Sequence, residues 1–369
     1  MFSSWHAALP WWWSLVFPLW VFVGHYNKPW MGVGVGMRQS RLPVAAGRHA
    51  MRHVRRFPAK LVAVAKAGNI RMTEDTIVPD IVDAQVHIGP GGIEHCLAAM
   101  DALGIRSVLV DEYWMSSGNG DPGYLLPNGV FRPLQPTAEL AAMLHPSRFS
   151  YLVRVDRRDS ELEAIVRMAG EAPYARAVRV TPGISQLEAS AFAQGEYDAV
   201  CAACLAAALP LFVFAPGQAQ AIGRYASKFP DLRIVIDHCG LTSPAMARAT
   251  GRDSSVQDPA QWQRSFDDIL ALSAFPNVAF KWAHAPAMFE SPGYPSDALG
   301  PYLRRVLDAF GAQRVMWASD VTANQTGESW AELLFGLRGL AGVSPSEKQA
   351  LLGATARTWL DWKVGSDTT

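Results

Sequence analysis

Residues 233–240 read RIVIDHCG, a short run of β-branched residues that ends in the polar pair Asp237-His238. Residues 314–320 read RVMWASD and follow the same pattern, with Asp320 as the last residue. Apolar runs without polar alternation are typical of strands buried on both faces, as in a parallel sheet. Both stretches therefore predict buried parallel strands whose carboxyl ends carry polar side chains.

The same pattern recurs throughout residues 78–362. We predict eight strands, at Ile81–Ile88, Ser107–Asp111, Ser150–Val155, Ala177–Thr181, Leu211–Ala215, Arg233–Asp237, Asn277–Trp282 and Arg314–Ser319. Ala- and Leu-rich segments predict helices at Ile93–Leu103, Ala138–His145, Ser160–Ala169, Tyr197–Ala208, Gln218–Phe229, Pro259–Ser273, Asp297–Phe310, Ser329–Leu340 and Ser344–Leu360. Eight strands alternating with helices predict an α/β fold, the (β/α)8 TIM barrel. An open doubly wound sheet is the alternative, but no Gly-x-Gly-x-x-Gly follows the first strand.

Residues 1–71 have a different composition. They hold ten Lys or Arg and no Asp or Glu, and six of the thirteen tryptophans lie in the first 30 residues. We interpret this segment as a non-globular extension, either disordered or not part of the functional protein. The apolar run Ala8–Gly24 leaves a membrane anchor open, and the Arg-rich stretch Arg38–Arg56 leaves a targeting peptide open.

The charge of the remaining chain excludes one class of partner. Residues 72–369 carry 23 basic and 33 acidic residues, a net charge of −10. Nucleic-acid binding needs a basic footprint, so we expect no nucleic-acid partner. Four cysteines are too few for a disulfide scaffold and suggest a reducing, cytoplasmic setting. Membrane association is not expected of the barrel, and the oligomeric state stays open between a monomer and a homodimer.

Three strand ends predict the active site. His87 ends the first predicted strand, His238 follows the sixth and Asp320 follows the eighth. A lone His at a strand end is more often structural than catalytic, and a lone Asp often caps the next helix. In a barrel, however, reactive groups gather at the carboxyl ends of the strands. The coincidence of all three at one end predicts that His87, His238 and Asp320 form a single catalytic site.

Other polar residues lie at the same end. Gln85 is two positions before His87, so both side chains point into the barrel mouth. The rest are Arg154 on the third strand, Arg179 on the fourth, and Lys281 and His284 at the seventh. Asp111-Glu112 ends the second strand and is expected to cap a helix or face solvent more readily than to line the pocket. The Gly- and Pro-rich stretch Asn119–Gly129 predicts a loop over the mouth.

Four motifs resemble the amidohydrolase-related branch of the amidohydrolase superfamily, over roughly residues 78–362. They are IVDAQVHIG at 81–89, FPDLRIVIDHCG at 229–240, RVMWASD at 314–320 and LLGATARTWL at 351–360. The branch includes L-fuconolactonase-like and 2-pyrone-4,6-dicarboxylate lactonase-like hydrolases and metal-dependent decarboxylases. The resemblance implies a small-molecule substrate with a reactive carbonyl, most readily a lactone or cyclic ester.

The chain departs from the metal-binding pattern of this family at two positions. His87, His238 and Asp320 match it, but Gln85 stands where the first His of a His-x-His pair would be. Phe214 lies about where the fifth-strand His would be. Gln is a poor zinc ligand and Phe is none. The expected cofactor is therefore either none or a single divalent metal, zinc first, held by His87, His238 and Asp320.

The resemblance implies a mechanism, and metal-free hydrolysis is the favoured version. Asp320 would act as the general base on water, and His87 and His238 would orient or polarise the carbonyl. Arg179 and Arg154 would bind a substrate carboxylate through a bidentate fork, with Gln85, Lys281 and His284 also expected to contact substrate. A metal-dependent decarboxylase and a non-catalytic ligand-binding descendant are the alternatives.

Overall fold

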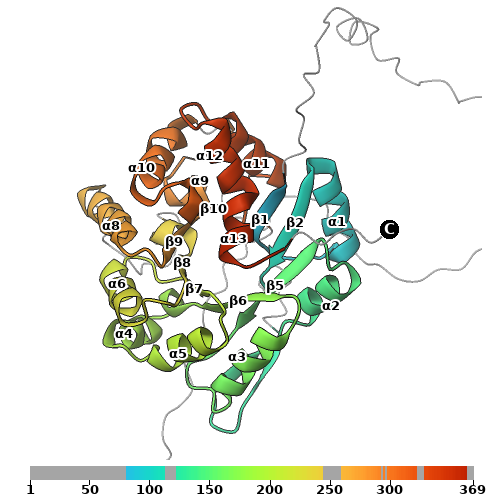
Figure 1. Ribbon diagram of the computed structural model, residues 1–369, viewed down its shortest axis with the longest axis vertical. Coiled ribbons are helices and arrows are strands. Elements are labelled where there is room, and N and C mark those ends of the chain that lie inside the picture. The colour runs from blue at the N-terminus through green and yellow to red at the C-terminus, as the bar shows by residue number, and fades with distance from the viewer. Residues whose placement is uncertain are drawn as a thin grey trace, which may run out of the picture. The chain divides into compact units, whose positions relative to one another are not determined.

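Eight parallel strands form the centre of the fold. The computed structural model describes residues 80–112, 122–243, 259–291, 294–295, 297–321 and 328–363. The strands are β1 (Ile81–Val86), β2 (Ile105–Val110), β5 (Phe149–Arg154), β6 (Ala175–Val180), β7 (Leu211–Val213), β8 (Ile234–Ile236), β9 (Val278–Ala283) and β10 (Val315–Ala318) (Figure 1). They are hydrogen-bonded neighbours in this order, and each overlaps a predicted strand.

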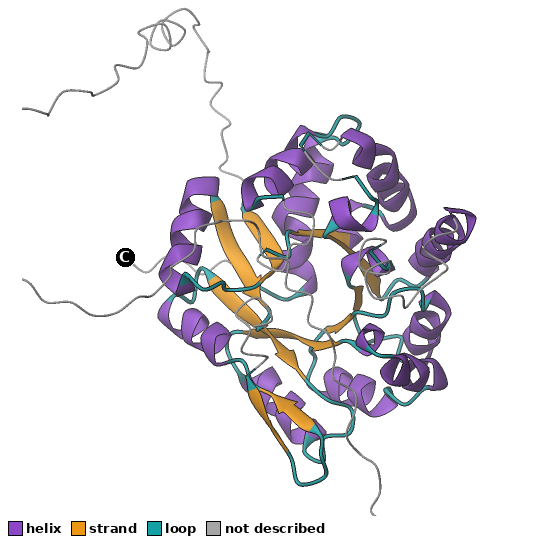
Figure 2. Ribbon diagram, turned by 180° about the vertical axis from the view of Figure 1, so that it is seen from behind, coloured by secondary structure: helices purple, strands orange, loops and turns teal. Residues whose placement is uncertain are grey.

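The first and last strands meet, so the sheet curls into a barrel. The N–H group of Asp320, just beyond β10, donates to the carbonyl of Gln85 in β1 at 3.0 Å. Helices surround the strands on the outside (Figure 2). The predicted (β/α)8 barrel is confirmed, and the open doubly wound sheet is wrong.

The helices lie between the strands as the sequence predicts. They are α1 (Gly92–Leu103), α2 (Pro136–Leu144), α3 (Leu162–Glu171), α5 (Asp198–Ala206), α6 (Ala219–Lys228), α8 (Pro259–Ala271), α10 (Gly300–Phe310) and α11 (Trp330–Gly339). Capping boxes begin α11 at Ser329 and α12 (Pro345–Gln349) at Ser344. From α12 the chain continues through a π-helical turn into α13 (Thr355–Trp359), as predicted for the last helix.

Two strands and two helices of the structure were not predicted from the sequence. Strand β3 (Gly123–Leu125), within the predicted loop, pairs with β4 (Phe131–Pro133), just beyond it, in an antiparallel hairpin. These two strands are largely exposed, so they lack the buried apolar run from which the barrel strands were predicted. The helices α4 (Gln186–Gln194) and α9 (Ala285–Met288) were also missed. Residues 119–121 of the predicted loop lie outside the described residues.

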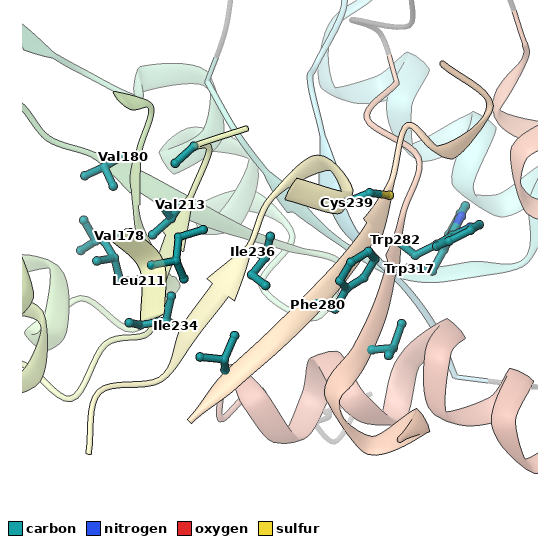
Figure 3. Close-up of a cluster of buried hydrophobic side chains, with 14 of the residues drawn as sticks. Val178, Val180, Leu211, Val213, Ile234, Ile236, Cys239, Phe280, Trp282 and Trp317 are labelled. Carbon is teal, nitrogen blue, oxygen red and sulfur yellow. The ribbon is translucent and has the colours of Figure 1, made fainter. Parts of the chain in front are cut away.

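Strand alternation divides the core into two layers. Residues such as Val178, Leu211, Ile234 and Phe280 form the outer layer, which packs between the strands and the helices (Figure 3). The inner layer fills the barrel and consists of Val82, Ala84, Leu109, Leu152, Ala177, Phe212, Val235, Ala279, Ala283, Met316 and Ala318. Trp359, Leu360 and Trp362, at and just after the last helix, pack into this inner cluster.

The C-terminal run closes the amino end of the barrel. Gly353 lies against the backbone carbonyl of Asp80, just before β1, where a Cβ atom would collide with it. Arg357 holds the Asp80 carboxylate with both Nε and Nη2, at 2.9 and 2.8 Å. With this end filled, the carboxyl end is the one left for a site.

The predicted extension at residues 1–71 lies outside the described residues, as do the apolar run and the Arg-rich stretch in it. Among the helices that the structure describes, none has the length and hydrophobicity needed to cross a bilayer. The four cysteines are free.

Candidate active site

A polar layer follows the apolar inner layer, two residues further along the strands. Because side chains alternate along a strand, residues two apart point to the same side. The pairs are Leu109 and Asp111, Leu152 and Arg154, Ala177 and Arg179, Val235 and Asp237, and Ala279 and Lys281, whereas on β7 the residue two after Phe212 is the apolar Phe214. The inside of the barrel therefore changes from apolar to charged toward its carboxyl end.

Asp111 is the centre of this charged layer. Its two carboxylate oxygens accept from Nε and Nη2 of Arg154 at 2.7 and 2.8 Å, and one also accepts from Nη1 of Arg179 at 2.5 Å. Burial would raise the pKa of Asp111, but the two guanidinium groups lower it below its usual range. The expectation that Asp111 caps a helix or faces solvent is wrong. Its neighbour Glu112 does cap a helix, since it accepts from the N–H of Ala138 in α2 at 2.8 Å.

Asp237 shares Arg179 with Asp111 and pairs with one further cation, Lys281. Arg179 Nε donates to Asp237 Oδ2 at 2.6 Å, and the Lys281 ammonium forms an ion pair with Oδ1. Lys281 also donates to the side-chain oxygen of Gln85. Burial would raise the pKa of Asp237, but Lys281 and Arg179 lower it, so this carboxylate is ionised. Burial lowers the pKa of Lys281, and Asp237 partly offsets that effect.

Above this layer, three imidazoles meet one carboxylate. His87 Nε2 lies 3.1 Å from Asp320 Oδ1, His238 Nε2 lies 3.0 Å from Oδ2, and His284 Nδ1 lies 3.2 Å from Oδ2. All four side chains are buried. The structure therefore brings together the three residues predicted as catalytic, and adds His284, which was expected only to contact substrate.

The backbone at this cluster is strained. His238, His284 and Asp320 have φ values of 50°, 56° and 59°, in the left-handed region that non-glycine residues seldom adopt. Such residues persist only where the surrounding structure holds them, and they concentrate at functional sites. Each of these residues lies just beyond its strand, so the left-handed turn sets the direction of its side chain.

Both ring nitrogens of His87 face hydrogen-bond acceptors. His87 Nδ1 lies 2.8 Å from the backbone carbonyl of Asp111, which only accepts, so Nδ1 carries the proton. The other nitrogen, Nε2, faces the Asp320 carboxylate, which is also an acceptor. A neutral imidazole has one N–H and cannot donate to both. Either His87 is an imidazolium, or a cation lies beside Nε2 and Asp320.

The electrostatics keep Asp320 ionised and His238 neutral. Burial would raise the pKa of Asp320, but His238, with His284 and His87, lowers it well below its usual range. Burial lowers the pKa of His238, and Asp320 partly offsets that effect. The buried Nδ1 atom of His238 has no hydrogen-bond partner among the described residues. Phe214 packs edge-on against this imidazole, with ring centroids 5.1 Å apart.

The cluster has the donor chemistry of a metal site. Ligand atoms of His238, His284 and Asp320 lie within 4.8 Å of one another. Two ligands of a tetrahedral zinc ion, each about 2.0–2.1 Å from it, are about 3.3 Å apart. The imidazole–carboxylate separations of 3.0–3.2 Å are close to that value. Nitrogen and carboxylate donors of this kind fit a zinc-type ion. Such an ion would also account for the contact between His87 Nε2 and Asp320, which face each other as two acceptors.

The other predicted site residues lie one layer deeper. Gln85, Arg154, Arg179 and Lys281 contact Asp111 or Asp237 with their polar groups. Arg154 keeps 14% of its side chain exposed, against 6% for Arg179. Their contact with substrate stays a prediction, in which Arg154 is the better placed of the two arginines.

Comparison with known proteins gives a consistent family match. A family model described as Amidohydrolase matches residues 134–362. The L-fucono-1,5-lactonase of Burkholderia ambifaria is 35% identical over 107 residues, which are 28% of this chain and 31% of the lactonase. The alignment thus spans about a third of that relative's length.

Solved structures match over the whole barrel. An amidohydrolase from Burkholderia multivorans with bound zinc has a TM-score of 0.58 at 17% identity, covering 76% of this chain and 99% of that one. A probable 2-pyrone-4,6-dicarboxylic acid hydrolase from Acinetobacter baumannii, with citric acid bound, has a TM-score of 0.55 at 11% identity, covering 77% and 100%. At these identities the likeness establishes the fold.

Proposed function

Because the chain belongs to the amidohydrolase family, we propose that it hydrolyses a small carbonyl substrate, a lactone or cyclic ester, with water activated at Asp320. The observation that carries this proposal is the convergence of three imidazoles on one ionised carboxylate at the mouth of the barrel. The match to an L-fucono-1,5-lactonase supports the choice of a lactone, although it covers a limited segment.

Each residue of the site has its own role in the proposed hydrolysis. Asp320 is ionised and accepts the proton of the attacking water. His87 and His238 hold its two oxygens in place, and a neutral His238 is suited to polarise the substrate carbonyl. His284 contacts the same oxygen of Asp320 as His238. Arg154, at the edge of the polar layer, binds a substrate carboxylate, with Arg179 beneath it.

A single divalent cation fits this proposal better than metal-free chemistry. A carboxylate whose pKa is held well below its usual range is a weak base, so water activation by Asp320 alone would be slow. A cation held by His238, His284 and Asp320, with His87 beside it, would lower the pKa of a bound water and polarise the carbonyl. Zinc is the first choice for this donor set.

The deciding experiment is turnover of a panel of small lactones before and after chelation, with metal content measured on the same sample. We expect lactone hydrolysis, about one equivalent of metal per chain, and loss of activity on chelation that zinc restores. Activity that survives complete metal removal would favour the metal-free version. Carbon dioxide release from an aromatic carboxylate, without lactone hydrolysis, would replace the proposal with a decarboxylase.

A further inference from the structure

Five side chains of the polar layer form a closed ring inside the barrel. The contacts run from Gln85 to Asp111, Arg179, Asp237 and Lys281, and from Lys281 back to Gln85. The five residues come from, or directly follow, the strands β1, β2, β6, β8 and β9. All five are buried, so the ring connects five strands away from water.

Gln85 is suited to close this ring because its amide has two different ends. Its oxygen accepts from the Lys281 ammonium, and its Nε2 donates to Asp111 Oδ2 at 3.4 Å. A glutamate would place a carboxylate against Asp111, and a methionine would make neither hydrogen bond. The charges on both sides fix the orientation of the amide.

The ring shares its backbone with the imidazole cluster above it. The carbonyl of Gln85 accepts from the N–H of Asp320 at 3.0 Å, and the carbonyl of Asp111 lies 2.8 Å from His87 Nδ1. Asp237 directly precedes His238, and Lys281 lies three residues before His284. The strained residues His238, His284 and Asp320 are therefore each attached to a member of the ring.

Stability alone does not require such a ring. Burying an ammonium, a guanidinium and two carboxylates is costly, and buried ion pairs can often be replaced by apolar residues without loss of stability. A closed set of fixed contacts does supply orientation, because moving any one side chain breaks a contact with its neighbours on either side.

We propose that Gln85 and Lys281 are positioning residues, which close this ring and thereby hold the three imidazoles in register with Asp320. Only the expected effect of these residues on turnover rests on the proposed function; their positioning role does not. Outer residues that orient metal ligands typically change metal affinity or activity by about 10- to 100-fold.

The test uses the full chain without metal, as wild type, Gln85→Met, Lys281→Met and the double variant. Arg304→Met is the matched control, since Arg304 pairs with Asp308 and Glu347 at 2.8 Å outside the barrel. Long-range nitrogen–proton spectra of the imidazoles report the tautomer of each histidine. We expect one fixed set of protonated ring nitrogens on His87 and on His238 in wild type and control, and averaged signals in the ring variants.

Zinc titration by calorimetry gives a second readout. We expect about 10- to 100-fold weaker zinc binding in each single variant. The double variant should lose no more than the worse single variant, because the first substitution already opens the ring. Losses that multiply would mean that the two residues act separately and would overturn the ring as one unit.

Folded ring variants with wild-type imidazole spectra and wild-type zinc affinity would overturn the proposal. Should a methionine variant fail to fold, Gln85→Glu tests the same point, because it keeps the contact to Lys281 and opposes Asp111. Unchanged spectra in Gln85→Glu would count equally against the ring. An absence of lactone turnover in wild type would refute the proposed function alone, because the imidazole spectra use neither substrate nor metal.

Discussion

His87 Nε2 lies 3.1 Å from Asp320 Oδ1, although 233 positions separate the two residues in the chain. This contact joins the first strand of the barrel to the segment after the last. It also brings a second acceptor to His87, because Nδ1 of a neutral His87 already donates its one proton to a backbone carbonyl and Nε2 faces the ionised carboxylate. Charge on His87 or a cation beside it resolves the conflict.

Asp320→Asn should lower kcat for lactone hydrolysis by about 100- to 10,000-fold, the usual contribution of a positioned acid or base. The amide keeps the size of the carboxylate but cannot accept a proton at neutral pH. Steady-state kinetics measure the effect, with Asp308→Asn on α10 as the control. A protein that only binds its ligand would keep its affinity and have no turnover to lose.

His284→Ala should weaken zinc binding by at least about 100-fold, above the range typical of residues that merely orient a ligand. His284 Nδ1 is 3.2 Å from Asp320 and belongs to the donor set. Calorimetric titration of metal-free protein measures the change. His145→Ala is the control, since His145 packs against Phe149 at a centroid distance of 6.1 Å and is absent from that set. Equal affinities in the two variants would exclude His284 as a ligand.

Arg179→Met should destabilise the fold by roughly 3–5 kcal/mol, because it removes a buried cation from between two carboxylates. Arg167→Met should cost about 0.5 kcal/mol or less, because its pair with Glu171 is exposed on α3. Urea denaturation compares the free energies of unfolding. Similar losses in the two variants would contradict the burial argument.

Asp83 should make stability depend on pH. Burial raises the pKa of Asp83, and hydrogen bonds from Ser319, Gln85 and Trp330 lower it. Burial has the larger effect, so the pKa rises from 3.8 to about 6. The folded state therefore holds the proton more tightly than the unfolded state. This contribution is complete below about pH 4 and is lost as the pH rises through 6, a change of about 3 kcal/mol.

The measurement for Asp83 compares wild type with Asp83→Asn by urea denaturation at pH 4.5 and pH 7.5. The asparagine does not titrate, so its stability relative to wild type should rise by up to about 3 kcal/mol at the higher pH. Contributions of other groups cancel in this difference. A constant difference across the pH range would show that Asp83 has the same pKa in both states.

Removal of residues 1–71, leaving Met72 as the first residue, should change neither the melting temperature nor lactone turnover by more than experimental error. The reason is that the predicted barrel begins at residue 78. Calorimetry and kinetics on both chains measure this. Association of the full chain with lipid vesicles, lost on truncation, would instead support the membrane-anchor interpretation of Ala8–Gly24.

The barrel could be predicted from the sequence because each of its strands is marked by a local pattern of residues. Runs such as Ile234–Ile236 and Val315–Ala318 are apolar on both faces, and the turns after them carry Asp237-His238 and Asp320. The rule that barrel sites lie at carboxyl ends of strands then selected three of the four residues in the cluster. The fourth, His284, was noticed for its position, but nothing local indicated that its left-handed backbone turns it onto Asp320.

Tertiary structure alone decided which charges pair. Arg154, Arg179 and Lys281 looked like free cations awaiting a substrate, and Asp111 looked like a cap. In the barrel, Asp111 and Asp237 pair with these cations, because strand order and curvature bring together residues 43 to 68 positions apart in the chain. Alternation along one strand determines which way a side chain points, whereas the partner it meets depends on how all eight strands close.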